Sequence, residues 1–104
     1  MRSTFKVLFY LKRNAPKKNG LIPVMCRITV NGKISQFSCK LDVEEKSWNV
    51  ELGRVSGRST VAQEANRMLD KIRVGINQAY QRISDRDNYV TAEKVRNAYL
   101  GYRL

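Results

Sequence analysis

The sequence predicts an α+β fold, with a three-stranded antiparallel sheet, one long helix packed on one face of it, and a short C-terminal helix. Three observations support this prediction. Apolar residues alternate with polar ones in three stretches before residue 42, an Asn31-Gly32 dipeptide separates two of these stretches, and a long segment after residue 59 repeats apolar residues every three or four positions. At 104 residues, the chain is long enough to bury one modest core.

The first strand is expected from Thr4 to Lys12. One set of alternating residues should face the core, namely Phe5, Val7, Phe9 and Leu11. The other set should face away from it and consists of Lys6, Leu8, Tyr10 and Lys12. Residues 13–20 follow as a loop, because Pro16 blocks a regular strand and Asn19-Gly20 favours a turn.

Leu21 to Leu41 predicts a hairpin. Asn31-Gly32 suits a type I′ turn, in which both central residues have positive φ. That turn pairs Val30 with Lys33, and the same register continues outward through three further pairs, Ile28 with Ser35, Cys26 with Phe37 and Val24 with Cys39. These residues form an apolar face. Pro23 cannot donate a ladder hydrogen bond, so an edge or a bulge is expected near it.

The remainder of the chain supplies the helices. Trp48, in the polar connection after the hairpin, is expected to fill the end of the space between sheet and helix. Thr60 and Gln63 have capping-box spacing at the start of a helix that runs to about Asp85. The apolar stripe of that helix consists of Ala65, Leu69, Ile72, Ile76, Ala79 or Tyr80, and Ile83.

A second, short helix is expected after a break. Thr91 should begin it and Gly101 should end it. Gly75, in the middle of the long helix, weakens that helix and is expected to mark a close approach to the sheet.

Charge is concentrated in the part of the chain that forms strands. The protein carries 20 Lys and Arg against nine Asp and Glu, a net charge of +11, and residues 1–40 hold nine of the cations and no acid. A one-sided positive field attracts nucleic acid or anionic lipid. No apolar run approaches the roughly 20 residues of a membrane span, and lysines interrupt the apolar pattern of residues 4–14, which does not suit a signal peptide, so a cytosolic location is expected.

The residues exclude several classes of chemistry. There is no histidine, no CxxC pair and no glycine-rich phosphate loop. We therefore expect no catalytic centre, no metal and no cofactor in this chain. The two cysteines, Cys26 and Cys39, lie on one face of the predicted hairpin and are expected to be reduced, half-buried thiols.

A nucleic-acid surface is the remaining candidate. The sheet face away from the long helix should present cations and hydrogen-bonding groups at strand spacing, and the loop after the first strand adds further cations. A layer of strands fits the major groove of duplex DNA, where Arg or Lys can recognise guanine and Gln can recognise adenine. The predicted DNA-binding residues are Lys6, Tyr10, Lys12, Arg13, Lys17, Lys18, Arg27, Thr29, Gln36, Ser38 and Lys40.

This order of elements resembles the N-terminal arm-type DNA-binding domain of tyrosine recombinases, in particular the integrases of phages and conjugative transposons. The resemblance lies in residues 5–11, in residues 22–28, in Lys46-Ser47-Trp48-Asn49 and in residues 89–95. It implies arm-site recognition by the sheet in the major groove, within a bacterial, nucleoid-associated integrase whose tyrosine nucleophile lies in a separate catalytic domain. Residues 1–85 would form the arm domain, and residues 86–104 a linker and the truncated start of a core-binding helical domain.

Two alternatives share the basic surface. An RNA-binding module would use exposed aromatic residues for stacking, for which Tyr10 is the one candidate on that face. A protein-interaction domain would add a partner strand to the exposed edge of the strand that begins near Leu21, and its binding would depend little on salt.

Overall fold

The computed structural model describes residues 4–14, 17–87 and 89–101. Its main sheet has three antiparallel strands in the order β1-β2-β3, namely β1 (Phe5–Leu11), β2 (Ile22–Val30) and β3 (Lys33–Val43). The remaining elements are a 3-10 turn η1 (Glu45–Ser47), the small hairpin β4 (Trp48–Asn49) and β5 (Arg54–Val55), and two helices, α1 (Thr60–Arg86) and α2 (Ala92–Leu100). The predicted α+β fold class is confirmed.

The β2–β3 hairpin has the predicted turn and register. Asn31 and Gly32 have φ values of 52° and 83°, as a type I′ turn requires. The ladder follows the expected pairs from Val30–Lys33 to Cys26–Phe37 and then shifts between Pro23 and Met25. The predicted Val24–Cys39 pair therefore falls inside a bulge, which the lack of an N–H on Pro23 favours.

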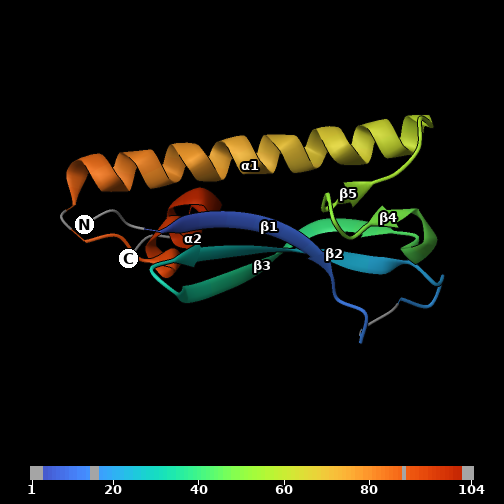
Figure 1. The fold of residues 1–104 in the computed structure, drawn as a ribbon, viewed down its shortest axis with the longest axis horizontal. Helices are drawn as coiled ribbons and strands as arrows, with labels where there is room; N and C mark the ends of the chain where they lie inside the picture. The colour runs from blue at the N-terminus through green and yellow to red at the C-terminus, as the bar shows by residue number, and fades with distance from the viewer. Residues whose placement is uncertain (1–3, 15–16, 88, 102–104) are drawn as a thin grey trace.

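The molecule has a layered arrangement in which α1 runs along one side of the sheet (Figure 1). Between α1 and the sheet, α2 fills one end and the β4–β5 hairpin fills the other (Figure 1). Accordingly, α1 packs most extensively on α2 and β5 and makes fewer direct contacts with β1 and β3. The long helix thus covers one face of the sheet, with smaller elements filling the space where helix and sheet diverge.

One hydrophobic core joins all of these elements. The inner face of β2 is fully buried at Val24, Cys26 and Ile28, each 0% exposed. The predicted stripe of α1 faces this core, and its buried residues are Ala62, Ala65, Leu69, Ile72, Ile76, Ala79 and Ile83. Trp48 is also buried, which confirms its predicted packing role.

The two helices are capped by side chains, with one difference from the prediction. Ser59, and not Thr60, is the N-cap of α1, because its hydroxyl accepts a hydrogen bond from the Ala62 amide. Both residue types can cap a helix, and α1 begins one residue earlier than the Thr60–Gln63 capping-box spacing predicts. Thr91 caps α2 as predicted, and Gly101, which has a φ of 83°, is the C-cap after the last helical residue, Leu100.

Gly75 marks a close approach, but to α2 and not to the sheet as predicted. A Cβ atom at this position would lie 2.5 Å from Cε1 of Tyr99. The Tyr99 ring also contacts Phe37 of β3, with 5.6 Å between ring centroids. Tyr99 therefore fills the space between α1 and the sheet, so a residue with no side chain is needed at position 75.

The position of α2 bears on the predicted division of the chain after residue 85. Ala92 and Val95 of α2 are 2% and 0% exposed and belong to the same core as the sheet. The helix thus packs on the residues that precede the proposed boundary. The division itself, and the onset of a further domain within residues 86–104, stay predictions.

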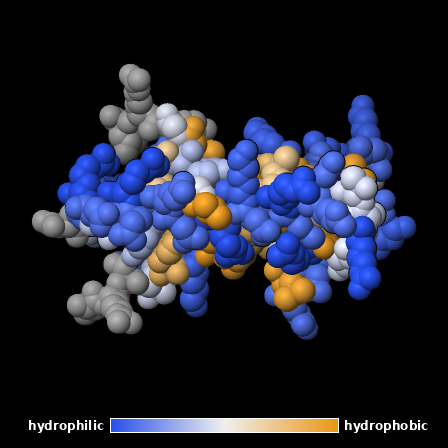
Figure 2. Space-filling model, turned by 90° about the horizontal axis from the view of Figure 1, so that it is seen from above, coloured by the Kyte–Doolittle hydropathy of each residue, from blue (hydrophilic) through white to orange (hydrophobic). Residues whose placement is uncertain are grey.

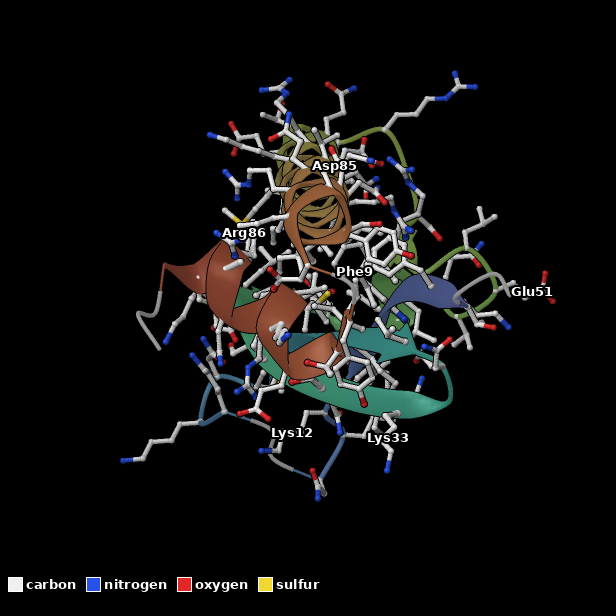
Figure 3. The ribbon with its side chains drawn as sticks, turned by 90° about the vertical axis from the view of Figure 1, so that its left-hand side faces the viewer. Phe9, Lys12, Lys33, Glu51, Asp85 and Arg86 are labelled. Carbon is white, nitrogen blue, oxygen red and sulfur yellow. The ribbon has the colours of Figure 1, made fainter. Side chains whose placement is uncertain are left out.

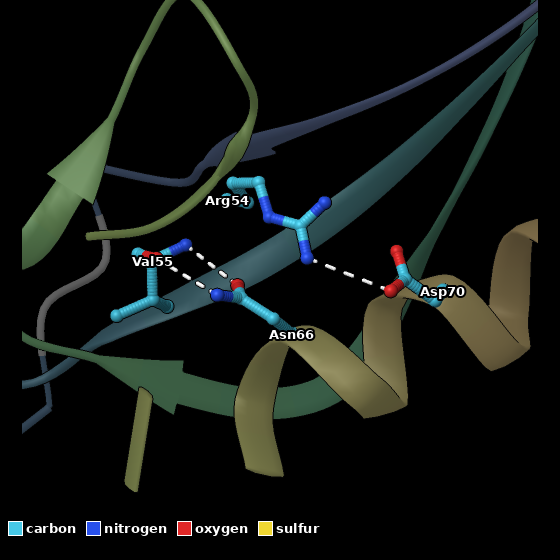
Figure 4. A network of polar contacts seen from close by, with 4 residues as sticks. All are labelled: Arg54, Val55, Asn66 and Asp70. Atoms are coloured by element: carbon cyan, nitrogen blue, oxygen red, sulfur yellow. Dashed lines mark hydrogen bonds and ion pairs between the residues drawn. The ribbon is translucent and has the colours of Figure 1, made fainter. Parts of the chain in front are cut away.

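Polar contacts fasten the β4–β5 hairpin to the start of α1 (Figure 4). The Asn66 side chain accepts a hydrogen bond from the Val55 amide and donates one to the Val55 carbonyl, both at 2.8 Å. Arg54 adds an exposed ion pair to Asp70 at 3.5 Å. Asn66 therefore satisfies the backbone of β5 as a neighbouring strand would, which fixes this end of the molecule.

Candidate nucleic-acid interface

The sheet has an open side away from α1, which we call the outer face. Strand pairing arranges its side chains in three rows across β1, β2 and β3. These rows are Lys6–Thr29–Ile34, Leu8–Arg27–Gln36 and Tyr10–Met25–Ser38. Because the register brings together residues far apart in sequence, six of the predicted DNA-binding residues, Lys6, Tyr10, Arg27, Thr29, Gln36 and Ser38, lie on one surface.

Apolar side chains interrupt this surface. Leu8 is 39% exposed and Ile34 is 53% exposed, and neither belongs to the core. Met25 pairs with Tyr10 on the same face and was not among the predicted residues. The period-two alternation through Arg27 and Thr29 would have identified it. Such side chains can contact thymine methyl groups, which line the major groove.

The centre of the outer face is a cluster of three side chains, Tyr10, Arg27 and Gln36, which we call the Tyr10 cluster. The Tyr10 hydroxyl donates a hydrogen bond to Oε1 of Gln36. The guanidinium carbon of Arg27 lies 4.7 Å from the centroid of the Tyr10 ring, within the range of a cation–π contact. The sequence indicated that these residues share a face, but not that they bind one another.

Burial of one atom in this cluster is unusual. Nε of Arg27 is solvent-excluded and has no hydrogen-bond partner among the described residues. A buried donor without an acceptor generally costs about 1–3 kcal/mol. The Arg27 side chain is therefore confined in a position whose remaining donors, on its two terminal nitrogens, are the ones available for an external ligand.

Ser38 borders the bulge of β3, since it still pairs with Met25, and Lys40 lies within the bulge. The Ser38 hydroxyl accepts a hydrogen bond from the Lys40 amide at 3.1 Å. Lys40 has a positive φ of 58° and an exposed side chain. Ser38 thus has a structural role in the bulge, whereas Lys40 presents a cation at the end of the outer face.

The remaining predicted cations, Lys12, Arg13, Lys17 and Lys18, lie at the end of β1 and in the loop after it, and all four are exposed. Seen along the sheet, Lys12 lies on the side away from α1, whereas Phe9 points between sheet and helix (Figure 3). Arg13 forms an ion pair with Glu45 at 3.0 Å, and Lys17 forms one with Asp42 at 2.7 Å. Pairs this exposed contribute at most about 1 kcal/mol, so phosphate groups can compete for these cations.

The strand that begins near Leu21 does not offer an edge for a partner strand, so that alternative is wrong as stated. β2 is the central strand and pairs with β1 on one side and β3 on the other. Of the two outer strands, β1 is covered in part, because Nη1 of Arg73 donates to the Val7 carbonyl at 3.0 Å. A side chain from α1 thereby occupies a backbone group that a partner strand would need.

The opposite side of the molecule has a different character. The exposed face of α1 is largely hydrophilic, with scattered apolar side chains (Figure 2). A cavity of about 550 Å³ between β3 and the first half of α1 is lined mainly by apolar residues, together with two serines and three acids, Asp42, Glu44 and Glu64. Carboxylates repel phosphate, so this cavity does not suit nucleic acid.

The two cysteines are buried free thiols, at 0% and 6% exposure, and not half-buried as predicted. Burial raises the pKa of Cys26 and of Cys39 to about 12. Both thiols are therefore protonated at neutral pH and are poor nucleophiles. Across the part of the chain that the structure describes, His, Cys, Asp and Glu side chains nowhere gather in groups of three that could hold a metal ion. The helices of these described residues are too short or too polar to span a bilayer.

Comparison with known proteins identifies the family of this chain and, through it, the kind of partner that it binds. Searches of curated proteins and of solved structures find no significant match. A sequence model of the arm DNA-binding domain matches residues 9–96, which include all three strands of the main sheet in whole or part, all of α1 and the first half of α2. DNA is therefore the partner that the match supports, and this chain belongs to the arm DNA-binding domain family.

Proposed function

We propose that this chain recognises specific arm sites in double-stranded DNA by inserting the outer face of its sheet into the major groove. In this proposal it is the N-terminal module of a tyrosine-recombinase integrase, and core-binding and catalytic domains of the same protein carry out recombination in association with the bacterial nucleoid. The proposal assigns no catalytic step to the present chain. Residues 86–104 would lead from the arm module toward the core-binding domain.

The observation that carries the proposal is the central row of the outer face. Arg27 and Gln36 lie opposite one another on adjacent strands, and both belong to the side-chain types that form paired hydrogen bonds with base edges. Three strands spaced about 4.8 Å apart extend about 10 Å across, which fits a major groove about 12 Å wide. Base contacts would come from this row.

Cations around the row would contact phosphate groups and set the position of the sheet. Lys6 lies at one end of the outer face, while Lys12, Lys17, Lys18 and Lys40 lie toward the other. With about five phosphates neutralised, the logarithm of the binding constant should fall with a slope of about −4.5 against the logarithm of salt concentration. Raising salt from about 50 to 200 mM would then weaken binding about 500-fold.

The test begins with selection of preferred sequences from a library of randomised duplexes, followed by titration of the selected and scrambled duplexes at several salt concentrations. We expect Arg27→Ala and Gln36→Ala to lose about 1–3 kcal/mol of discrimination between these duplexes. Lys17→Ala should weaken binding to every duplex alike, because it removes a phosphate contact and no base contact.

Lys71→Ala is the matched control, since Lys71 is an exposed cation on α1 and its loss changes the net charge by the same amount as Lys17→Ala. It should leave discrimination unchanged and affect binding less than Lys17→Ala does. Folded Arg27→Ala and Gln36→Ala proteins that discriminate like the wild type would refute the proposal. Equal, weak binding to every duplex would refute it as well and would favour a structured RNA or a protein partner.

A further inference from the structure

Tyr10 occupies an unusual position in the cluster at the centre of the outer face. Its backbone pairs with Met25 on β2, yet its hydroxyl reaches Gln36 on β3. The phenol ring therefore leans diagonally across the central strand. The guanidinium carbon of Arg27 lies 4.7 Å from the centroid of this ring. One side chain from β1 thus contacts the two residues best suited to bind bases.

The hydrogen bond from Tyr10 limits which hydrogen-bonding groups of the Gln36 amide can contact DNA. A glutamine that recognises adenine uses both halves of its amide, since Oε1 accepts from the adenine amino group and Nε2 donates to N7. In this structure Oε1 accepts the Tyr10 hydroxyl. The amide oxygen is thereby turned toward the protein, and the Nε2 group, with its two N–H donors, is left for another partner.

Arg27, like Gln36, is left with hydrogen-bond donors to present to a ligand. Arginine carries N–H donors and no acceptor. Its Nε is solvent-excluded, and the Tyr10 ring lies against the guanidinium group. The groups that remain for a ligand are donors on the two terminal nitrogens. The Arg27–Gln36 row therefore presents donors from both of its polar residues.

From this geometry we propose that Tyr10 is a specificity-determining residue that makes the central row of the outer face a donor-only surface, which selects guanine over adenine. Guanine presents two acceptors in the major groove, O6 and N7, whereas adenine presents one acceptor and one donor. A row of donors complements the first pattern and opposes the amino group in the second. The inference rests on the proposed function, because it concerns base recognition by the same face.

The experiment compares the base preferences of wild-type protein and Tyr10→Phe, both measured by selection from the same randomised duplex library. The wild type should select guanine at adjacent positions. Tyr10→Phe keeps the ring beside Arg27 but removes the hydroxyl, which frees Oε1 of Gln36. One guanine position should then shift toward adenine, with the guanine-to-adenine ratio changing by a factor of about 5 to 150, while the position bound by Arg27 keeps guanine.

Two further variants make the result specific. Tyr10→Phe combined with Gln36→Ala should abolish the gain of adenine, since the freed acceptor is then absent. Tyr89→Phe removes a hydroxyl from an exposed tyrosine that is not part of the outer face, and its base preferences should match those of the wild type. Because Tyr10 lies outside the core, circular dichroism and a melting curve should show that each Tyr10 variant remains folded.

Unchanged base preferences in Tyr10→Phe would overturn the inference, and so would an equal loss of affinity for every duplex, which would give Tyr10 a packing role alone. Either result leaves the proposed function intact if the wild type still selects a sequence. If the wild type selects no sequence at all, the proposed function fails, and the role of Tyr10 fails with it.

Discussion

The two faces of the main sheet are built from the same three strands, yet different physical rules govern them. On the inner face, alternate residues such as Val24, Cys26 and Ile28 are fully buried beneath the helices. On the outer face, the residues between them are partly exposed and contact one another, as Tyr10 contacts Arg27 and Gln36. Burial of apolar side chains alone determines the arrangement of the inner face. Contacts between specific pairs of side chains determine the arrangement of the outer face.

This difference implies that substitutions on the two sides should affect different properties of the protein. Changes beneath the helices should alter the free energy of unfolding. Changes on the outer face should alter DNA binding and leave stability nearly unchanged, because those side chains lie outside the core. The following predictions concern the buried side, in order of decreasing effect.

Ile76→Asp should have the largest effect. Ile76 is 0% exposed in the middle of the α1 stripe, so the aspartate would lose apolar packing and carry a charge without a partner. We expect a loss of at least about 4 kcal/mol, which is most of the stability of a domain near the lower end of the usual range of about 5–15 kcal/mol. Urea unfolding followed by circular dichroism would measure the loss, and reduced dispersion of the amide resonances would reveal any unfolded fraction.

Val74→Asp is the control for this substitution, two residues away on the same helix. Val74 is 55% exposed, so its replacement should change the free energy of unfolding by about 0.5 kcal/mol or less. If Ile76→Asp were folded and as stable as Val74→Asp, the assigned inner face of α1 would be wrong.

Gly75→Ala tests the contact between α1 and α2. Alanine is the better helix former by about 1 kcal/mol, but its Cβ would meet the Tyr99 ring, which packs against Phe37 and cannot move freely. Overpacking of this kind costs about 1–3 kcal/mol, so we expect net destabilisation in urea unfolding. In a Tyr99→Leu background the clash is removed, and the same substitution should become stabilising. An identical effect in both backgrounds would contradict the packing described for Tyr99.

The buried thiols predict a smaller, pH-dependent effect. Burial raises the pKa of Cys39 from 9.0 to about 12, so the unfolded state ionises at lower pH than the folded state. The contribution of this thiol to stability is therefore full below about pH 9 and is lost as pH rises toward 12. At about pH 9.5 the loss amounts to about 0.8 kcal/mol.

Urea unfolding at about pH 8 and pH 9.5 measures this loss, and Cys39→Ala isolates it from the titration of other groups. The wild type should lose more stability than the variant between the two pH values. Equal losses would mean that the Cys39 thiol is accessible to water in the folded protein.

Sequence patterns predicted the inner face better than the outer one, and the reason is physical. The Asn31-Gly32 turn and the alternation of β2 determine which side chains point inward, and these are local properties of the chain. The long stripe of α1 is likewise local. The N-cap at Ser59 and the partner of Gly75 were missed because they depend on the path of the chain before α1 and on the docking of α2.

For the interface, alternation identified the face but not its internal contacts. The Tyr10–Gln36 hydrogen bond is diagonal and spans three strands, so no sequence spacing indicates it. The ion pairs of Arg13 with Glu45 and of Lys17 with Asp42 join segments that approach one another only in the folded molecule. Patterns predict which residues share a surface, whereas the contacts among them require the tertiary structure.

The most direct test of the central claim is to record the backbone amide resonances of the protein while adding a selected duplex. The account predicts that the largest shifts occur on the outer face, at Lys6, Thr29 and Gln36, with smaller ones in the loop that carries Lys17 and Lys18. The exposed cations of α1, Arg67, Lys71 and Arg82, should shift little. Largest shifts along α1, with an unperturbed outer face, would contradict the assignment of the sheet as the DNA-binding surface.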